Sequence, residues 1–107
     1  MRARPDLRVV YDEGCSVLHV SGELDIGSAP ILRETFLGLL NRDEVPDVVM
    51  DLSGVTFADS SGLAVLLMGA RRWAAEGSKL VVRQPSRTLT RIVDLTGVRQ
   101  AFLFEED

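Results

Sequence analysis

The 107-residue sequence has one cysteine, Cys15, and one histidine, His19. One cysteine cannot form a disulfide within the chain, which excludes the framework of a small secreted disulfide-rich protein and fits a reducing cytosol. One cysteine and one histidine also cannot supply a Cys/His zinc shell. The sequence contains neither a Gly-x-Gly pair nor a Gly-x-x-x-x-Gly-Lys stretch, so it lacks a phosphate-cradling loop for a nucleotide. We therefore expect no metal ion and no cofactor.

Long hydrophobic runs and an excess of positive charge are also missing. The longest apolar stretch, residues 63–70, is far below the roughly 20 residues that a membrane span requires. Basic residues at the start of the chain are not followed by an apolar run, and Asp12 and Glu13 come too early for a signal peptide. The net charge of −4 opposes nonspecific binding to nucleic acid or to anionic membranes. We expect a cytoplasmic protein with neither as a partner.

The residues that are present indicate one globular domain over residues 1–107. Hydrophobic residues make up 46% and charged residues 26%, and this length allows one modest core. Short or alternating apolar segments indicate strands, and apolar residues three or four apart indicate helices. The expected strands are residues 7–12, 16 to about 24, 47–52 and 79–83, with residues 101–104 as a last strand or a packing segment. The expected helices run from the N-cap Ser28 to before Pro46, from 60 to about 76, and from 85–86 to Gly97.

This order, β-β-α-β-α-β-α with a possible final strand, indicates an α/β domain with a mixed sheet. The first two strands should form a hairpin, and residues 54–58 should connect the third strand to the second helix. The expected core stripe of the second helix is Leu63, Leu66, Leu67, Ala70 and Ala74. Ala64, Val65 and Met68 lie off this stripe, so the helix is either buried on two sides or offers a second face to a partner.

Residues 55–63 carry the most informative local signal, because a buried strand there leads through polar residues into a helix. In open α/β sheets such loops lie where ligands and partners bind. Asp59, Ser60 and Ser61 can each cap the free amides of the first helical turn, and capping alone would account for them. A phosphate on a serine there would meet unpaired N–H groups and the positive end of the helix dipole, so the fold could tolerate it. A partner packed on this loop would have to bury about −1.5 to −2 charge.

Three motifs together resemble the STAS domain and, more narrowly, the bacterial anti-sigma factor antagonists. They are Gly-Glu-Leu-Asp at residues 22–25, Asp-Leu-Ser-Gly-Val-Thr-Phe-Ala-Asp-Ser-Ser-Gly-Leu at 51–63 and Ile-Val-Asp-Leu-Thr-Gly-Val at 92–98. The resemblance implies a mixed sheet of four to five strands with packed helices. It also implies a protein that binds an anti-sigma factor serine kinase and thereby releases the sigma factor. Phosphorylation by that kinase breaks the complex, and a phosphatase restores it.

Carried onto this sequence, the resemblance implies that Ser60 is the phosphorylated residue, with Ser61 as the adjacent alternative. Gly62 would keep the approach to the helix open. The expected partner-binding residues are Asp25, Asp59, Ser60, Ser61, Gly62, Val65 and Met68. Some stand-alone STAS domains serve instead as accessory subunits of transporters or signalling scaffolds without phospho-control, and this alternative stays open.

An enzyme acting through Ser60 is the third hypothesis. Ser60 lies between a strand and a helix, but Ala58 occupies the first glycine position of the Gly-x-Ser-x-Gly nucleophile motif, and His19 is on the early hairpin. Arginines are scattered rather than interleaved with aromatic residues, which argues against a nucleic-acid surface. We therefore expect a regulatory binding protein with no catalytic residues.

Overall fold

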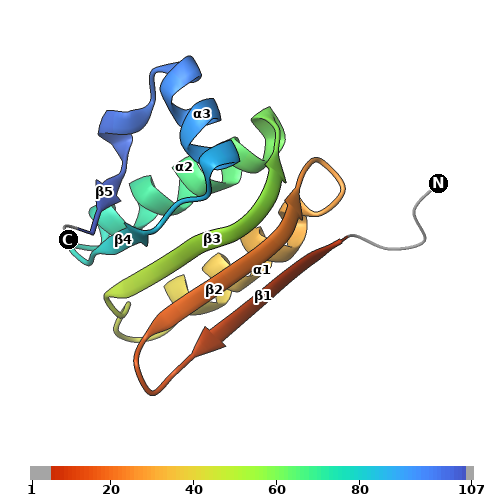
Figure 1. Cartoon of the computed structure of the whole chain (residues 1–107). Helices are drawn as coiled ribbons and strands as arrows, with labels where there is room; N and C mark the ends of the chain where they lie inside the picture. Colours follow the sequence, from red (N-terminus) through yellow and green to blue (C-terminus); the bar gives the residue numbers. More distant parts are fainter. Residues whose placement is uncertain (1–5, 106–107) are drawn as a thin grey trace.

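The computed structural model describes residues 6–105, so the basic start of the chain and residues 106–107 lie outside the described residues. Five strands form one sheet in the order β1-β2-β3-β4-β5 (Figure 1). β1 is antiparallel to β2, and the other neighbouring pairs are parallel. The expected mixed sheet and first hairpin are confirmed. The strands are β1 (Leu7–Asp12), β2 (Val17–Leu24), β3 (Val48–Ala58), β4 (Leu80–Arg83) and β5 (Leu103–Phe104).

The hairpin turn between β1 and β2 lies at the end of the sheet where β2 begins. It contains Cys15, which is exposed. The hydroxyl groups of Tyr11 and Ser16 lie 2.7 Å apart across the base of the turn, and Ser16 donates to the carbonyl of Asp47. The turn is therefore fixed to the chain just before β3, at the end of the sheet where the parallel strands start.

β3 is longer than the sequence pattern predicts, and the expectation that residues 54–58 form a connection is wrong. These residues continue β3 beside β2, with Gly54 paired to Ser21 and Ala58 paired to Leu24. Two register shifts interrupt this pairing. Such irregularities break the regular alternation of side chains, so the apolar pattern of a strand is lost. A Cβ on Gly54 would lie only 2.8 Å from the Cβ of Ser21, which explains the glycine at this close approach.

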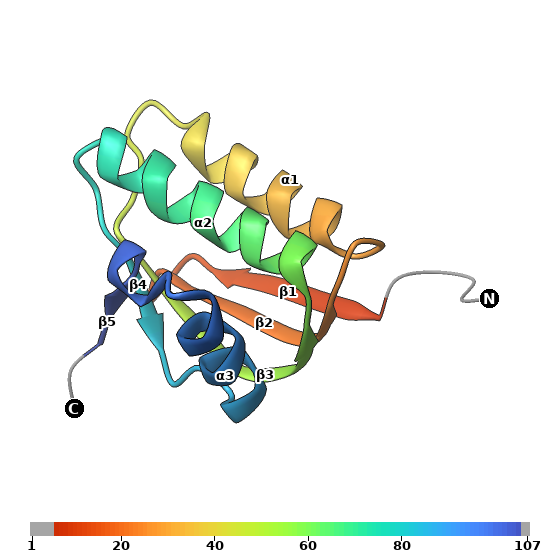
Figure 2. The ribbon, with the colours of Figure 1, turned by 90° about the horizontal axis from the view of Figure 1, so that it is seen from above.

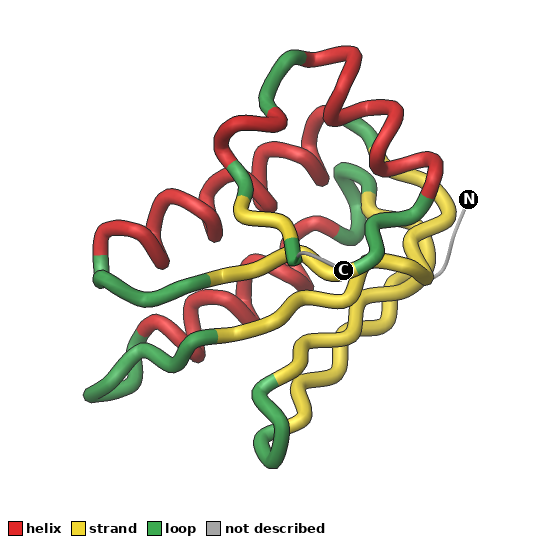
Figure 3. Tube along the Cα trace, turned by 60° about the vertical axis from the view of Figure 1, so that its left-hand side comes forward, coloured by secondary structure: helices red, strands yellow, loops and turns green. Residues whose placement is uncertain are grey.

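Three α-helices follow the strands in alternation, as Figure 3 traces. They are α1 (Ala29–Leu40), α2 (Ser60–Ala75) and α3 (Arg87–Thr96), and a short 3-10 helix (Arg99–Ala101) precedes β5. Figure 2 shows α1 and α2 side by side along the sheet. α3 begins at the capping residue Ser86 and ends at Gly97, whose φ of 71° is the left-handed conformation of a glycine stop. The predicted third helix is thus confirmed at both ends.

The core between α1, α2 and the sheet is built around Trp73, which is fully buried. Its indole packs edge-on against Phe36, with ring centroids 5.4 Å apart, and donates to the carbonyl of Pro46 at 2.9 Å. Gly69 lets the two helices approach, because a Cβ there would lie 2.6 Å from the Phe36 ring.

The expected core stripe of α2 is correct only in part. The buried residues of α2 are Gly62, Leu63, Leu66, Gly69 and Trp73. Leu67 and Ala70 are half-buried and Ala74 is exposed. The buried line of α2 therefore runs through Gly62 and Gly69, where the absence of a side chain permits close approach, and not through Leu67, Ala70 and Ala74.

Candidate functional site

The carboxyl ends of β2 and β3 lie side by side (Figure 1). The candidate site consists of the loop that leaves β2 together with Asp59 and the start of α2, which follow β3 directly. Leu24 pairs with Ala58 at the ends of the strands. One residue later, the N–H of Asp59 donates to the carbonyl of Leu24 at 3.2 Å. The start of α2 is therefore placed directly beside the loop between β2 and α1, as expected for a site at the carboxyl edge of parallel strands.

Asp59 is the cap of α2. One carboxylate oxygen accepts the N–H of Gly62 at 3.0 Å, and the other accepts the N–H of Ile26 at 3.3 Å. Of the three residues that could cap the helix, Asp59 does so. Ser60, the first residue of α2, is exposed, and Ser61 is partly buried. The side chain that caps the helix is therefore not the side chain proposed for modification.

Asp25 and Ser28 hold the loop between β2 and α1 in one shape. A carboxylate oxygen of Asp25 accepts the N–H groups of Gly27 and Ser28, each at 3.0 Å. The buried hydroxyl of Ser28 donates to the carbonyl of Glu23 at 2.6 Å and accepts the N–H of Asp25 at 2.9 Å. This is a dense set of local hydrogen bonds of the Asx-turn kind, which orders the loop without a partner.

The structure corrects the expected role of Ser28. It occupies the N-cap position of α1, followed by Pro30 in the first turn, but its side chain makes no capping hydrogen bond to the helix. The Ser28 hydroxyl is committed to Glu23 and Asp25 instead. The backbone carbonyl of Asp25 accepts the N–H of Ala29 at 2.8 Å and so satisfies one of the free amides of the helix start.

The other expected partner-binding residues differ in what they expose. Gly62 is buried, and a Cβ there would lie 2.4 Å from the carbonyl oxygen of Leu24. The absence of a side chain at Gly62 therefore permits the tight contact of α2 with the end of β2. Val65 and Met68 are partly buried and pack against the core, so each presents only part of its side chain.

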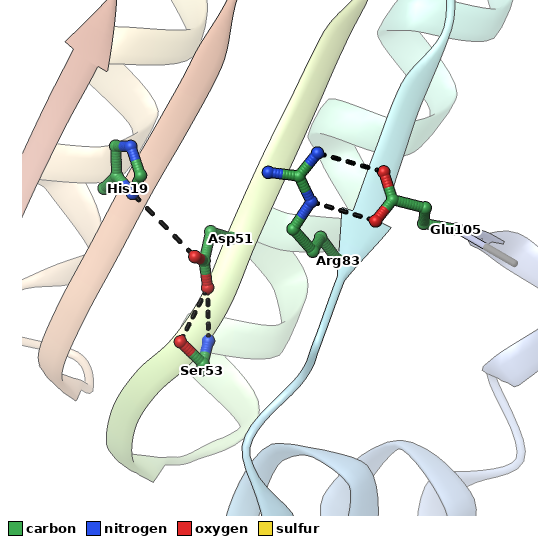
Figure 4. Close-up of polar contacts among 5 residues, drawn as sticks. All are labelled: His19, Asp51, Ser53, Arg83 and Glu105. Atoms are coloured by element: carbon green, nitrogen blue, oxygen red, sulfur yellow. Dashed lines mark hydrogen bonds and ion pairs between the residues drawn. The ribbon is translucent and has the colours of Figure 1, made fainter. Parts of the chain in front are cut away.

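His19 lies on the sheet rather than in this site (Figure 4). Its Nδ1 is 3.9 Å from a carboxylate oxygen of Asp51 on β3. Burial acts to raise the pKa of Asp51, but the hydrogen bonds from Ser53, with smaller contributions from His19 and Arg83, outweigh it and leave the pKa below its ordinary value. Ser53 donates to Asp51 and not to His19, so these three side chains do not form the serine–histidine relay of a hydrolase.

Two residues at the site were not among those expected from the sequence. Ile26 is 76% exposed and Phe57 is 47% exposed, both high for large apolar side chains. Ile26 follows Asp25 directly, and Phe57 precedes Asp59 by two positions. The one signal in the sequence was an isolated isoleucine in a loop otherwise made of Asp, Gly and Ser. The sequence did not indicate that Phe57 is exposed at the site, because its hydrophobic pattern placed residues 54–58 in a connection and not in a strand.

Within residues 6–105, no three His, Cys, Asp or Glu side chains are grouped so that they could hold a metal ion. No helix in this part of the chain has the length and apolar character needed to span a membrane.

The comparisons with known proteins agree with this geometry. The family model described as "Mlab, STAS domain" matches residues 7–105. The anti-sigma-B factor antagonist of Bacillus subtilis (strain 168) is 32% identical over 91 residues, which cover 85% of this chain and 82% of that protein.

Solved structures show the same relationship. A crystal structure of an anti-sigma factor antagonist from Mycobacterium paratuberculosis has a TM-score of 0.81 and 28% identity, covering 99% of this chain and 92% of that one. The phosphorylated form of the Bacillus cell fate determinant SpoIIAA has the same fold, with a TM-score of 0.68, 17% identity and coverage of 94% and 92%. The chain therefore belongs to the STAS domain family, as its three sequence motifs predict.

Proposed function

We propose that this protein is an anti-sigma factor antagonist that binds an anti-sigma factor serine kinase and is released when that kinase phosphorylates Ser60. The observation that carries the proposal is the exposure of Ser60 at the first position of α2, beside the hydrogen-bonded loop between β2 and α1. The relatives named anti-sigma factor antagonists support it, because they match most of the chain. SpoIIAA, which has the same fold, has been solved in a phosphorylated form, so this fold is compatible with phosphorylation.

The exposure of the two serines favours Ser60 as the acceptor, since Ser61 is partly buried. In the proposed reaction the kinase transfers the γ-phosphoryl group of ATP to Oγ of Ser60, and ADP and the hydroxyl proton leave. The phosphatase uses water to restore the serine and release inorganic phosphate. This protein supplies the hydroxyl group in the first step, and the ATP belongs to its partner.

The position of Ser60 explains how one modification would leave the fold intact and end binding. A phosphate at the start of α2 meets the positive end of the helix dipole, which favours negative charge. The same phosphate adds about −1.5 to −2 charge next to the Asp59 carboxylate. A partner that covered this surface would have to bury that charge unpaired, at a cost of several kcal/mol. Docking is therefore lost while the domain remains folded.

The expected docking surface combines the exposed and half-exposed residues of the site. Ser60 and the partly exposed Asp25, Asp59 and Ser61 lie around the start of α2. The partly exposed Val65 and Met68 extend this surface along the helix, past the buried Gly62. Asp25 contributes by holding its loop in place, because its carboxylate accepts the N–H groups of Gly27 and Ser28.

The test is a binding and phosphorylation experiment with a purified anti-sigma factor kinase from the same organism. We expect Ser60→Ala to bind and to stay bound when ATP is added, and Ser60→Asp to bind at least a hundredfold more weakly. Thr88→Asp is the matched control, because it places the same charge in the first turn of α3 at an exposed position. Mass spectrometry should locate the phosphoryl group on Ser60.

Equal affinity of Ser60→Asp and the wild-type protein would contradict the switch. Copurification with transporter subunits, unaffected by either change at Ser60, would favour the accessory-subunit alternative. A covalent phosphonate adduct on Ser60 in the isolated protein would favour an enzyme.

A further inference from the structure

We propose that Ile26 and Phe57 form an apolar pair that anchors the partner next to Ser60, by entering a dry apolar concavity on the partner. This inference rests on the proposed function, since the partner is the anti-sigma factor kinase. It adds the contact that supplies affinity, whereas phosphorylation of Ser60 supplies control.

Ile26 and Phe57 are both exposed, although their side chains are large and apolar. Among the residues that the structure describes, the exposed large hydrophobic side chains are Val10, Ile26, Phe57, Leu95 and Leu103. The apolar pair supplies two of the five. Val10, Leu95 and Leu103 lie on β1, α3 and β5, whereas Ile26 and Phe57 both adjoin Asp59 in space or in sequence.

Ile26 and Phe57 both lie next to the segment that leads into Ser60. The N–H of Ile26 donates to the carboxylate of Asp59, so Ile26 lies against the residue that precedes Ser60. Phe57 lies on β3 opposite Glu23 of β2, two residues before Asp59. The pair therefore comes from the carboxyl ends of two neighbouring parallel strands, at the same end of the sheet as Ser60 (Figure 1). Both residues are linked to the proposed phosphorylation site through Asp59, which accepts the N–H of Ile26 and directly precedes Ser60.

Hydrogen bonds order the backbone at both Ile26 and Phe57. The backbone N–H groups of residues 25–28 donate to the side chains of Asp25, Ser28 and Asp59. Phe57 is held by strand pairing. The backbone at both residues is therefore ordered before docking, with the two side chains exposed. Because the loop is already ordered, docking loses little conformational entropy there, and most of the gain from removing apolar surface from water remains as affinity.

The apolar character of the pair and the acidic residues near it indicate which kind of partner surface it contacts. Apolar side chains that are rigid and near the centre of a contact are the usual sources of binding energy, provided that the partner excludes water around them. Glu23 pairs with Phe57 in the sheet, Asp25 precedes Ile26, and Asp59 accepts the N–H of Ile26. With the net charge of −4, these acids disfavour an anionic lipid surface as the occupant. A dry apolar pocket also makes a phosphate on adjacent Ser60 harder to accommodate, because an unpaired charge is most costly where water is excluded. Affinity and control would thus arise at one surface.

The experiment measures the dissociation constant of the purified anti-sigma factor kinase for Ile26→Thr and Phe57→Thr. Each change should weaken binding at least tenfold, consistent with the loss of one well-buried apolar side chain. Ile26→Val keeps the shape and should change affinity by less than about threefold. Leu103→Thr is the matched control, because Leu103 is 54% exposed on the distant edge strand β5 and should leave the affinity unchanged. Urea unfolding of each variant verifies that the fold is retained.

The outcomes separate this inference from the proposed function. If both threonine variants bind like the wild-type protein while Ser60→Asp does not bind, the anchoring pair is wrong and the switch stands. If the wild-type protein does not bind the kinase at all, the proposed function fails and the inference fails with it. If the threonine variants instead convert a dimer of this chain to a monomer with unchanged affinity for the kinase, the pair covers a second copy, and the inference is overturned.

Discussion

The carboxylate of Asp59 accepts the N–H of Ile26 at 3.3 Å while it also caps α2 through the N–H of Gly62. A helix cap that reaches a second loop is more than a local stop signal. The same side chain sets where α2 begins and where the loop between β2 and α1 lies relative to Ser60. The shape of the proposed docking surface therefore depends on one charged residue.

Removing this carboxylate should loosen both elements at once. Asp59→Ala should lower the free energy of unfolding by about 1 kcal/mol, the usual cost of losing a helix cap. In addition, the amide hydrogen of Ile26 should exchange faster with solvent, because its acceptor is gone. Urea unfolding and hydrogen exchange would measure the two effects.

Ser86→Ala is the matched control for Asp59→Ala. Ser86 caps α3 through the N–H of Leu89 at 3.2 Å, away from the candidate site. A similar loss of stability is expected, with no change in exchange at Ile26. If Asp59→Ala left exchange at Ile26 unchanged, the link between the two loops would be disproved.

The glycines of α1 and α2 should respond in opposite directions to alanine. Gly62→Ala should destabilise the protein by about 1–3 kcal/mol, because the new methyl group would lie 2.4 Å from the carbonyl oxygen of Leu24. Gly38→Ala should stabilise it by about 0.5–1 kcal/mol, because nothing lies within 4 Å and alanine favours the helix. Thermal and urea unfolding would show the contrast. Similar effects of the two changes would argue against the tight contact at Gly62.

Trp73 combines a fully buried ring with a buried hydrogen bond, so we expect its substitution to lower the stability of the fold strongly. Trp73→Phe removes the hydrogen bond to the carbonyl of Pro46 and leaves a void beside Phe36, so a loss of about 2 kcal/mol is expected. Tyr11→Phe also removes one hydrogen bond, to Ser16, but at a half-buried position, and should cost less. Circular dichroism during urea unfolding would compare them. An equal cost for the two variants would mean that burial of the indole contributes little.

Acid should weaken the contact that fixes β5. The Arg83 guanidinium lowers the pKa of Glu105 below its ordinary value of 4.5, through hydrogen bonds of 2.9 and 3.1 Å. Since the folded pKa is the lower one, the unfolded chain binds more protons, and this stabilisation is present above pH 4.5 and is lost as pH falls through the folded pKa.

The matching variant is Glu105→Gln, whose unfolding free energy should depend less on pH in the acid range. The two stability curves should converge once the pH falls below the lowered folded pKa of Glu105, where the carboxyl group of the wild-type protein is protonated. Parallel curves from pH 7 to pH 3 would show that the ion pair does not contribute.

The sequence predicted the elements whose signals are local. Alternation in residues 7–12 gave β1, and the glycines at 77 and 97, with φ of 75° and 71°, mark the helix ends that their residue type indicates. The start of α2 at Ser60 was also predicted, because polar capping residues directly follow an apolar strand. Each of these features depends on neighbouring residues along the chain.

The features that were not predicted depend on contacts between distant residues. Residues 54–58 become strand only because β2 lies beside them, with register shifts that hide the alternation. The hydroxyl of Ser28 leaves its expected capping role because Glu23 and Asp25 surround it in the folded loop. The exposure of Phe57 follows from the same folded geometry, so the pattern of residue types did not reveal it, whereas the isolated isoleucine at position 26 in a polar loop was an available signal.

The hairpin turn between β1 and β2 offers a labelling site at the end of the sheet opposite Ser60. Cys15 is exposed, is the sole cysteine of the sequence and lies where the parallel strands begin, whereas Ser60 follows a strand that runs away from that turn. A dye or a surface linker attached to this thiol would leave the Ser60 end facing the solution. The slower tumbling of the dye-labelled protein in its complex with the partner could then be recorded without any substitution in the sequence. The dye would lie outside the surface that contacts the partner.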